Sequence, residues 1–210
     1  MITKEHILSN CILSSIAHAI MTNVYPELDY EQSWDSVSYS IINDDERCTI
    51  SFSNDFCVGI VKNYNAPLYF GENVERNLLQ GFPEDIVKFA KNEALLYLLE
   101  DINGKADYCA TGAFWSDNKG VYFSKECNSA VISRIFSDIG DLFDDLVAYY
   151  DMDSQTRELV LELFNLKNSN MSAQIILTES QLAKIPGGNI LDECAQSLAE
   201  LSIFVSQDIE

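Results

Sequence analysis

Three short segments separated by turn signals constrain the fold of this chain most strongly. Residues 37–41 (VSYSI) and 48–52 (CTISF) alternate between polar and apolar side chains on either side of a polar tetrapeptide at 43–46. After a second turn at Asn54 and Asp55, residues 56–61 (FCVGIV) are apolar almost throughout. A two-residue alternation indicates strands with one buried face, and an uninterrupted apolar run indicates a strand buried on both faces. The spacing predicts a three-stranded antiparallel meander whose third strand is central.

Helices are predicted before and after this meander. The first covers residues 4–23, where apolar residues share one broad face before Pro26. A second is predicted over 83–103, because a proline and two acidic residues mark its start and Asn103-Gly104 marks its end. Further helices are expected at 129–150, 154–167 and 191–205, and further strands at 109–115 and 121–123. Residues 173–178 are either a sixth strand or the start of a longer irregular segment. This order predicts an α+β fold, an antiparallel sheet packed against several helices, in one domain spanning residues 1–210.

Acidic residues are in large excess and are unevenly distributed. The formal net charge is −20, and eight acidic residues but no basic ones lie between Lys4 and Arg47. Basic residues are also missing between Arg134 and Arg157 and after Asp192. Such charge repels nucleic acid and anionic membranes and attracts basic protein partners. We therefore expect no nucleic-acid partner and no membrane partner.

The N-terminal sequence and the cysteines indicate the cellular compartment of the protein. The apolar stretch 7–20 is interrupted by polar residues, so we expect it to be a helix of the fold and not a signal peptide. No apolar run approaches the ~20 residues of a membrane span. Six cysteines are widely spaced and none forms a CxxC pair. This pattern predicts reduced, buried thiols, no zinc site and a cytoplasmic location.

Catalytic and metal-binding motifs are missing from the sequence. The two histidines, His6 and His18, would lie ~18 Å apart along one helix, too far to share a metal or a proton. No GxSxG, P-loop, GxGxxG or HExxH motif is present. Residues 151–162 resemble an EF-hand loop, but Thr156 replaces the required glycine, and Asp153 is better explained as a helix cap. We expect no enzymatic activity, no cofactor and no metal.

Aromatic residues interleave with carboxylates in two places, ahead of the first strand and near residue 150. Aromatic anchors surrounded by charge are typical of protein interfaces, where the charges set the association rate. The alternative is that Trp34 and Tyr150 cap the core. The predicted partner-binding residues are Glu27, Asp29, Tyr30, Glu31, Trp34, Asp35, Asp44, Asp45, Asp138, Asp141, Asp145, Tyr149, Tyr150, Asp151 and Asp153. Asp138, Asp141 and Asp145 are expected to form a row on one helix.

A family resemblance supports the same interpretation. The motif Ser33-Trp34-Asp35, the meander 39–61 with its TISF and VG segments, and a helix at 93–99 followed by Ala113-Phe114-Trp115 resemble small cytoplasmic immunity proteins of bacterial polymorphic toxin systems. The resemblance covers roughly residues 30–165. It implies a monomer that binds a cognate protein toxin one to one through direct contact and needs no catalytic residue. The toxin is expected to present a basic surface.

Two other functions are compatible with the sequence. Chaperones and adaptors for secreted effectors are also acidic and α+β, but they are usually shorter, dimeric and grooved. An inhibitor that mimics DNA would place carboxylates at the spacing of phosphates, which the predicted row of aspartates on one helix would do in part.

Overall fold

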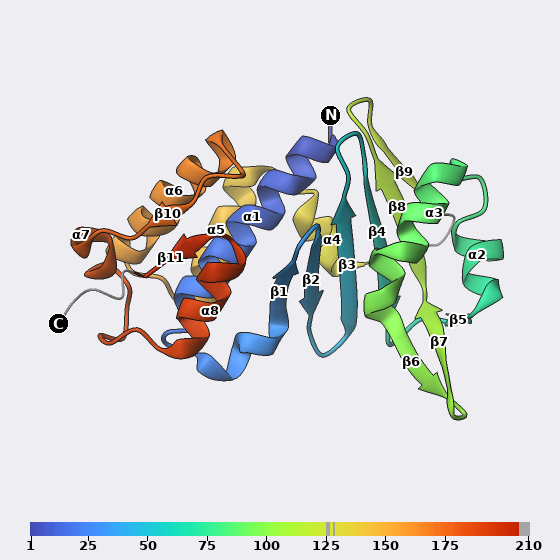
Figure 1. Ribbon diagram of the computed structural model, residues 1–210, viewed down its shortest axis with the longest axis horizontal. Helices are drawn as coiled ribbons and strands as arrows, with labels where there is room; N and C mark the ends of the chain where they lie inside the picture. Colours follow the sequence, from blue (N-terminus) through green and yellow to red (C-terminus); the bar gives the residue numbers. More distant parts are fainter. Residues whose placement is uncertain (125–126, 128, 206–210) are drawn as a thin grey trace. The chain divides into compact units, whose positions relative to one another are not determined.

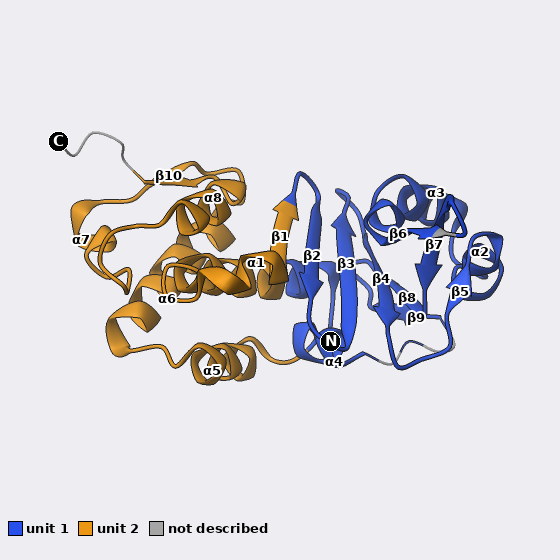
Figure 2. Cartoon of the chain, turned by 90° about the horizontal axis from the view of Figure 1, so that it is seen from below, with its two compact units in different colours: residues 1–8, 35–136 blue, residues 9–34, 137–210 orange. Residues whose placement is uncertain are grey.

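The computed structural model describes residues 1–124, 127 and 129–205, apart from the side chain of Ile102 (Figure 1). The chain forms two compact units (Figure 2). Unit 1 contains residues 1–8 and 35–136, and unit 2 contains residues 9–34 and 137–210. The helix α1 (Lys4–Met21) and the strand β1 (Gln32–Asp35) each contain one of the boundaries. Both units are therefore assembled from segments that are distant in the sequence.

The main sheet of unit 1 is antiparallel and contains the predicted meander. Its strands lie in the order β2 (Ser38–Ile42), β3 (Glu46–Phe52), β4 (Cys57–Asn63), β8 (Gly112–Ser116) and β9 (Val121–Phe123). The strand β4 lies between β3 and β8, which confirms that the third strand of the meander is central. The tight turn between β2 and β3 is closed by Asn43, whose Oδ1 accepts the backbone N–H groups of Asp45 and Glu46. The fold class is thus α+β, as predicted.

A glycine in the central strand makes room for an aromatic ring. Gly59 is paired directly with Phe114 on the neighbouring strand β8. A Cβ atom at position 59 would lie only 2.0 Å from Cε1 of Phe114. Position 59 therefore requires glycine because the buried ring of Phe114 occupies the space of a side chain.

The prediction of one helix over residues 83–103 is wrong for the second half of this segment. The helix α3 (Glu84–Asn92) is followed by a 3-10 turn, η2 (Ala94–Leu98), and then by β6 (Leu99–Ile102). Asn103 and Gly104 both have positive φ and form the hairpin turn to β7 (Lys105–Ala110). The apolar run fits the core in either geometry, so its composition did not identify the strand. The resemblance segment 93–99 is accordingly not an α-helix.

The rest of unit 1 completes a second, smaller sheet. Its strands lie in the order β5 (Tyr69–Phe70), β7 and β6, and the helix α2 (Glu72–Leu78), which was not predicted, follows β5. The strand predicted at 109–115 is interrupted at Thr111, so that β7 and β8 belong to different sheets. The helix α4 (Ala130–Ile135) ends this unit.

The predicted helix 129–150 is also two helices. Ser129 caps α4, whereas Asp138 caps α5 (Ile139–Tyr150) by accepting the backbone N–H of Gly140 at 3.1 Å. The boundary between the units falls between these helices, after Phe136. The continuous apolar stripe therefore belonged to two separate helices.

Unit 2 is mainly helical. It contains α1 from Ser9 onward, the 3-10 helix η1 (Pro26–Glu31), α5, α6 (Ser154–Ser169), α7 (Glu179–Leu182) and α8 (Asp192–Glu200). Two short parallel strands pair in this unit, β10 (Ile175–Ile176) and β11 (Ile203–Phe204). The first is shorter than the strand considered at 173–178, and the second lies where the end of the helix 191–205 was predicted. The helix α1 is buried from Asn10 to Met21. None of the helices in the described ranges is long and apolar enough to cross a bilayer.

Candidate protein-binding site

The acidic excess is concentrated in unit 2. The sequence segments of unit 2 contain 17 acidic and 3 basic residues, a formal charge of −14, whereas those of unit 1 contain 16 and 10, a formal charge of −6. More than two thirds of the charge of −20 therefore belongs to the smaller unit. Repulsion among like charges opposes folding of such a unit, and binding of a basic partner relieves it.

The three basic residues of unit 2 are engaged locally. Lys167 is buried, which lowers its pKa, and its Nζ donates to the carbonyl oxygens of Met171 and Ala173. Lys184 lies 3.3 Å from a carboxylate oxygen of Glu158 and 3.4 Å from one of Glu162. Arg157 donates through Nε to the backbone carbonyl of Met152. Among the residues that the structure describes, Glu27, Asp29, Asp141 and Asp145 form no salt bridge.

A tyrosine of α5 joins the two predicted acidic segments. The hydroxyl of Tyr149 donates to the carboxylate of Glu31, at 3.1 Å from Oε2 and 3.3 Å from Oε1. Tyr149 remains 53% exposed, so its ring lies at the surface between α5 and η1. The structure thus brings together two segments that the sequence indicated separately.

A buried polar network lies beneath this contact. Tyr150 is only 2% exposed, and its hydroxyl lies 2.9 Å from Nδ1 of His18 and 3.4 Å from Nε2 of Gln32. Tyr150 is therefore a core residue, as the alternative interpretation held, and its side chain is not available to a partner. Burial lowers the pKa of His18 to about 4, although the backbone and charge of Asp29 oppose the shift. His18 is accordingly neutral at physiological pH and positions Tyr150.

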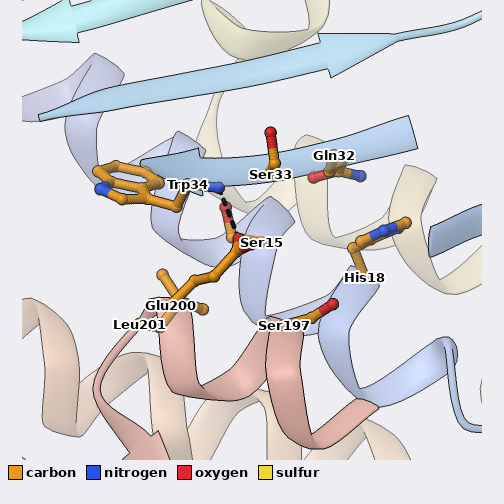
Figure 3. A pocket seen from close by; sticks show the side chains of 8 residues that line it. All are labelled: Ser15, His18, Gln32, Ser33, Trp34, Ser197, Glu200 and Leu201. Atoms are coloured by element: carbon orange, nitrogen blue, oxygen red, sulfur yellow. Dashed lines mark hydrogen bonds between the residues drawn. The ribbon is translucent and has the colours of Figure 1, made fainter. Parts of the chain in front are cut away.

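Trp34 forms one wall of a small polar cavity (Figure 3). Its backbone N–H donates to Oε2 of Glu200 at 2.7 Å, and the ring is half-buried. The space that a water-sized sphere can occupy is about 10 Å³, which is room for about one water molecule. The cavity is too small for a partner side chain, so Trp34 can contact a partner only with the exposed part of its ring. The lining residues are Ser15, His18, Gln32, Ser33, Trp34, Ser197, Glu200 and Leu201.

The predicted row of aspartates on α5 is partly correct. Asp141, Asp145 and Tyr149 follow one another at four-residue intervals and are all exposed, so they share one side of the helix. Asp138 lies at the N-cap, not within the helix, because its side chain accepts from Gly140. In η1, Oδ1 of Asp29 accepts a hydrogen bond from the hydroxyl of Ser197, which lies in α8.

We call the side chains of these two segments the acidic surface. Its members are exposed, except for the half-buried Glu31, and come from η1 and α5: Glu27, Asp29, Tyr30, Glu31, Asp141, Asp145 and Tyr149.

Asp151 and Asp153 mark the junction of α5 and α6. Asp151 has a left-handed backbone, with φ of 49°, and ends α5. Asp153 caps α6 by accepting the backbone N–H of Thr156 at 2.8 Å, and this hydrogen bond lowers the pKa of its carboxyl group. The predicted role of Asp153 as a helix cap is confirmed. Over the ranges described, no group of three or more histidine, cysteine or acidic side chains is arranged to hold a metal ion.

Three of the predicted partner-binding residues belong to unit 1. Asp35 accepts a hydrogen bond from the hydroxyl of Tyr97 at 2.8 Å. Asp44 and Asp45 lie in the turn between β2 and β3, where Oδ1 of Asp45 accepts from the side-chain amide of Asn65. The other twelve predicted residues belong to unit 2.

Sequence reasoning missed the residues that hold η1 and the 186–191 segment in place. Asn23 donates to the carbonyl oxygens of Pro186 and Asn189 and accepts the backbone N–H of Leu191. Glu200 and Ser197 similarly contact residues more than 160 positions away. No local pattern in the sequence indicates such contacts, because their partners are distant along the chain.

The chain was compared with protein families, curated proteins and solved structures. No family model, no curated protein and no solved structure matches it.

Proposed function

We propose that this chain is an immunity protein that neutralises a cognate bacterial toxin by direct contact in the cytoplasm. The observation that carries the proposal is the charge of −14 on unit 2, together with the contact between Tyr149 and Glu31 that gathers the carboxylates and aromatic rings of η1 and α5. This arrangement provides the two things that a fast and tight protein inhibitor needs.

The first is electrostatic attraction. Carboxylates gathered on one surface steer a basic partner toward it and raise the association rate in a salt-dependent manner. Nucleases and other enzymes that act on nucleic acid carry such basic surfaces, so an acidic inhibitor binds where their substrate would bind.

The second is a set of aromatic anchors. Tyr30 is 66% exposed and Tyr149 is 53% exposed, both beside carboxylates. Tyrosine is enriched among the residues that dominate interface energies, because it buries a large rigid area and keeps a polar group. Binding of this kind requires no catalytic residue, and we propose that the chain is not an enzyme.

The proposal is tested by expressing the toxin encoded beside this gene in bacteria, with and without the chain. Survival that depends on the chain, together with a one-to-one complex in light scattering after gel filtration, is the expected result. Cell death although the chain is folded and abundant would contradict it. A dimer that binds only an unfolded segment would indicate a chaperone, and an inhibitor that competes with DNA for unrelated basic proteins would indicate a DNA mimic.

A further inference from the structure

A cavity of about 140 Å³ opens in unit 2 beside the junction of α5 and α6. By the same measure it is more than ten times larger than the cavity beside Trp34. It is formed by the C-terminal end of α1, the residues that follow it, the 150–153 segment and Pro186. It is therefore large enough to receive part of a partner side chain.

The walls of this cavity are apolar and adaptable. Met21 and Met152 are buried and come from the two separate sequence segments of unit 2. Val24, Tyr25 and Pro186 add apolar surface, and the lining is completed by Tyr150, Asp151, Asp153 and Thr156. Methionine fills irregular spaces and adjusts to different ligands, and a tyrosine ring provides a flat surface for aliphatic or cationic groups.

Two carboxylates lie at the rim of this cavity, and they differ in their contacts. Asp153 is held by the backbone N–H of Thr156, and the nearby charge of Arg157 contributes to its lowered pKa. Asp151 is exposed, and its carboxylate makes no salt bridge or side-chain hydrogen bond with any residue that the structure describes. Asp151 is therefore the charge at this rim that a ligand can neutralise.

We infer that this cavity binds a long cationic side chain, an arginine or a lysine, of a basic partner protein. The aliphatic part of the side chain lies against Met21, Met152 and Tyr25, and the charged group reaches Asp151 at the rim. Long cationic side chains bury their stems on apolar surface in this manner while the charge stays near water. The identity of the partner as a toxin rests on the proposed function, but the chemistry of the cavity does not.

A titration with N-acetyl-arginine methylamide, followed by ¹H–¹⁵N NMR of the full chain, tests this inference. N-acetyl-norleucine methylamide serves as the uncharged comparison. We expect chemical-shift changes at the amides of Val24, Tyr25 and Met152, with a dissociation constant on the order of 1–10 mM for so small a ligand. The norleucine compound should bind more weakly at the same amides.

Two variants and a control make the test specific. Asp151→Asn removes only the charge, because asparagine tolerates the left-handed backbone at this position, and it should weaken binding about two- to fivefold. Val24→Trp fills the mouth from an exposed position and should abolish the shifts at Tyr25 and Met152. Asp55→Asn, in a turn of unit 1, changes the net charge equally and should leave binding unchanged.

Shifts spread over acidic residues of both units, or equal affinity for wild type and Asp151→Asn, would overturn the inference. Because the probe is a blocked amino acid and not a toxin, this failure would leave the proposed immunity function standing. Conversely, localised binding of the arginine compound by a chain that protects no cell from its neighbouring toxin would refute only the function.

Discussion

The hydroxyl of Tyr149 donates a hydrogen bond to the carboxylate of Glu31 across 118 positions of sequence. This contact places the end of α5 against η1, where two stretches without basic residues meet in space. Below it, the hydroxyl of Tyr150 lies 2.9 Å from Nδ1 of His18, a buried contact that joins α5 to α1. The surface that we propose for toxin binding is therefore built on a buried network and is fixed before a partner arrives, which limits the entropic cost of binding.

Removing the hydroxyl of Tyr149 should affect stability only slightly. Tyr149→Phe loses one hydrogen bond to a carboxylate, but both groups are partly exposed, so we expect a loss of about 0.5–1 kcal/mol in the free energy of unfolding. Urea denaturation of Tyr149→Phe, Glu31→Gln and the double variant measures the coupling. If the two single losses add fully in the double variant, the hydrogen bond does not contribute to stability.

Acid should destabilise the chain through His18 in a defined window. Burial lowers its pKa to about 4, against 6.5 for an ordinary histidine, so the unfolded chain binds more protons between these values. Stability is then fully present above pH 6.5 and falls as the pH decreases toward 4, by up to about 3 kcal/mol from this group.

The pH effect is measured as the difference between wild type and His18→Gln in urea denaturation from pH 7 to pH 4.5. Wild type should lose more stability than the variant over this range. The variant His6→Gln leaves His18 as the single histidine and allows its ring to be titrated directly by NMR. A ring that titrates near 6.5 in the folded chain would contradict the account.

The cap of α6 should contribute measurably to folding. Asp153→Ala removes the acceptor for the backbone N–H of Thr156, and we expect a loss of about 1 kcal/mol. Asp153→Ser retains a capping oxygen and should recover most of it. The comparison of melting temperatures decides between a cap and a calcium ligand, since added calcium should change neither variant nor wild type.

The cysteines should be unreactive in the folded chain. Burial raises the pKa of the Cys127 and Cys194 thiols to about 12 and raises that of Cys48 and Cys109 as well. Thiolate is the reactive form, so we expect slow reaction with a disulfide reagent at pH 8 and six rapid equivalents in guanidinium without reductant. Rapid labelling of the native chain, or fewer than six thiols after unfolding, would contradict this expectation.

Secondary structure could be predicted where a sequence pattern is compatible with only one kind of element. The alternation at 37–52 fits only strands with a buried face, and the polar residues from Asn43 to Glu46 marked the turn between the first two strands. The apolar run at 94–99 is equally compatible with a helix and with the 3-10 turn and strand that the structure contains, because both bury it. At 136–138 the apolar stripe continues at helical spacing through a break, so periodicity alone did not reveal that unit 1 ends there and unit 2 resumes.

The residues of the candidate site could be predicted from the sequence, but their arrangement in space could not. Acidic and aromatic residues near 30 and 149 stood out in the sequence, whereas their pairing depends on the packing of α1, α5 and η1. Tyr149 and Tyr150 look alike in sequence, and only helical phase places one at the surface and the other in the core. The cavity beside Asp151 combines Met21, Met152 and Pro186, whose proximity no local pattern indicates.

The most direct test of the central claim is the rate of association with the neighbouring toxin as a function of salt concentration. The double variant Asp141→Asn/Asp145→Asn alters the acidic surface of unit 2, and Asp55→Asn/Asp85→Asn makes the same change of charge at exposed positions of unit 1. We predict that the unit 2 variant associates several-fold more slowly at low salt and with a flatter salt dependence, while its dissociation rate changes little. The unit 1 variant should stay close to wild type. Equal effects of the two variants, or association that does not depend on salt, would contradict the claim that the acidic surface of unit 2 captures the partner.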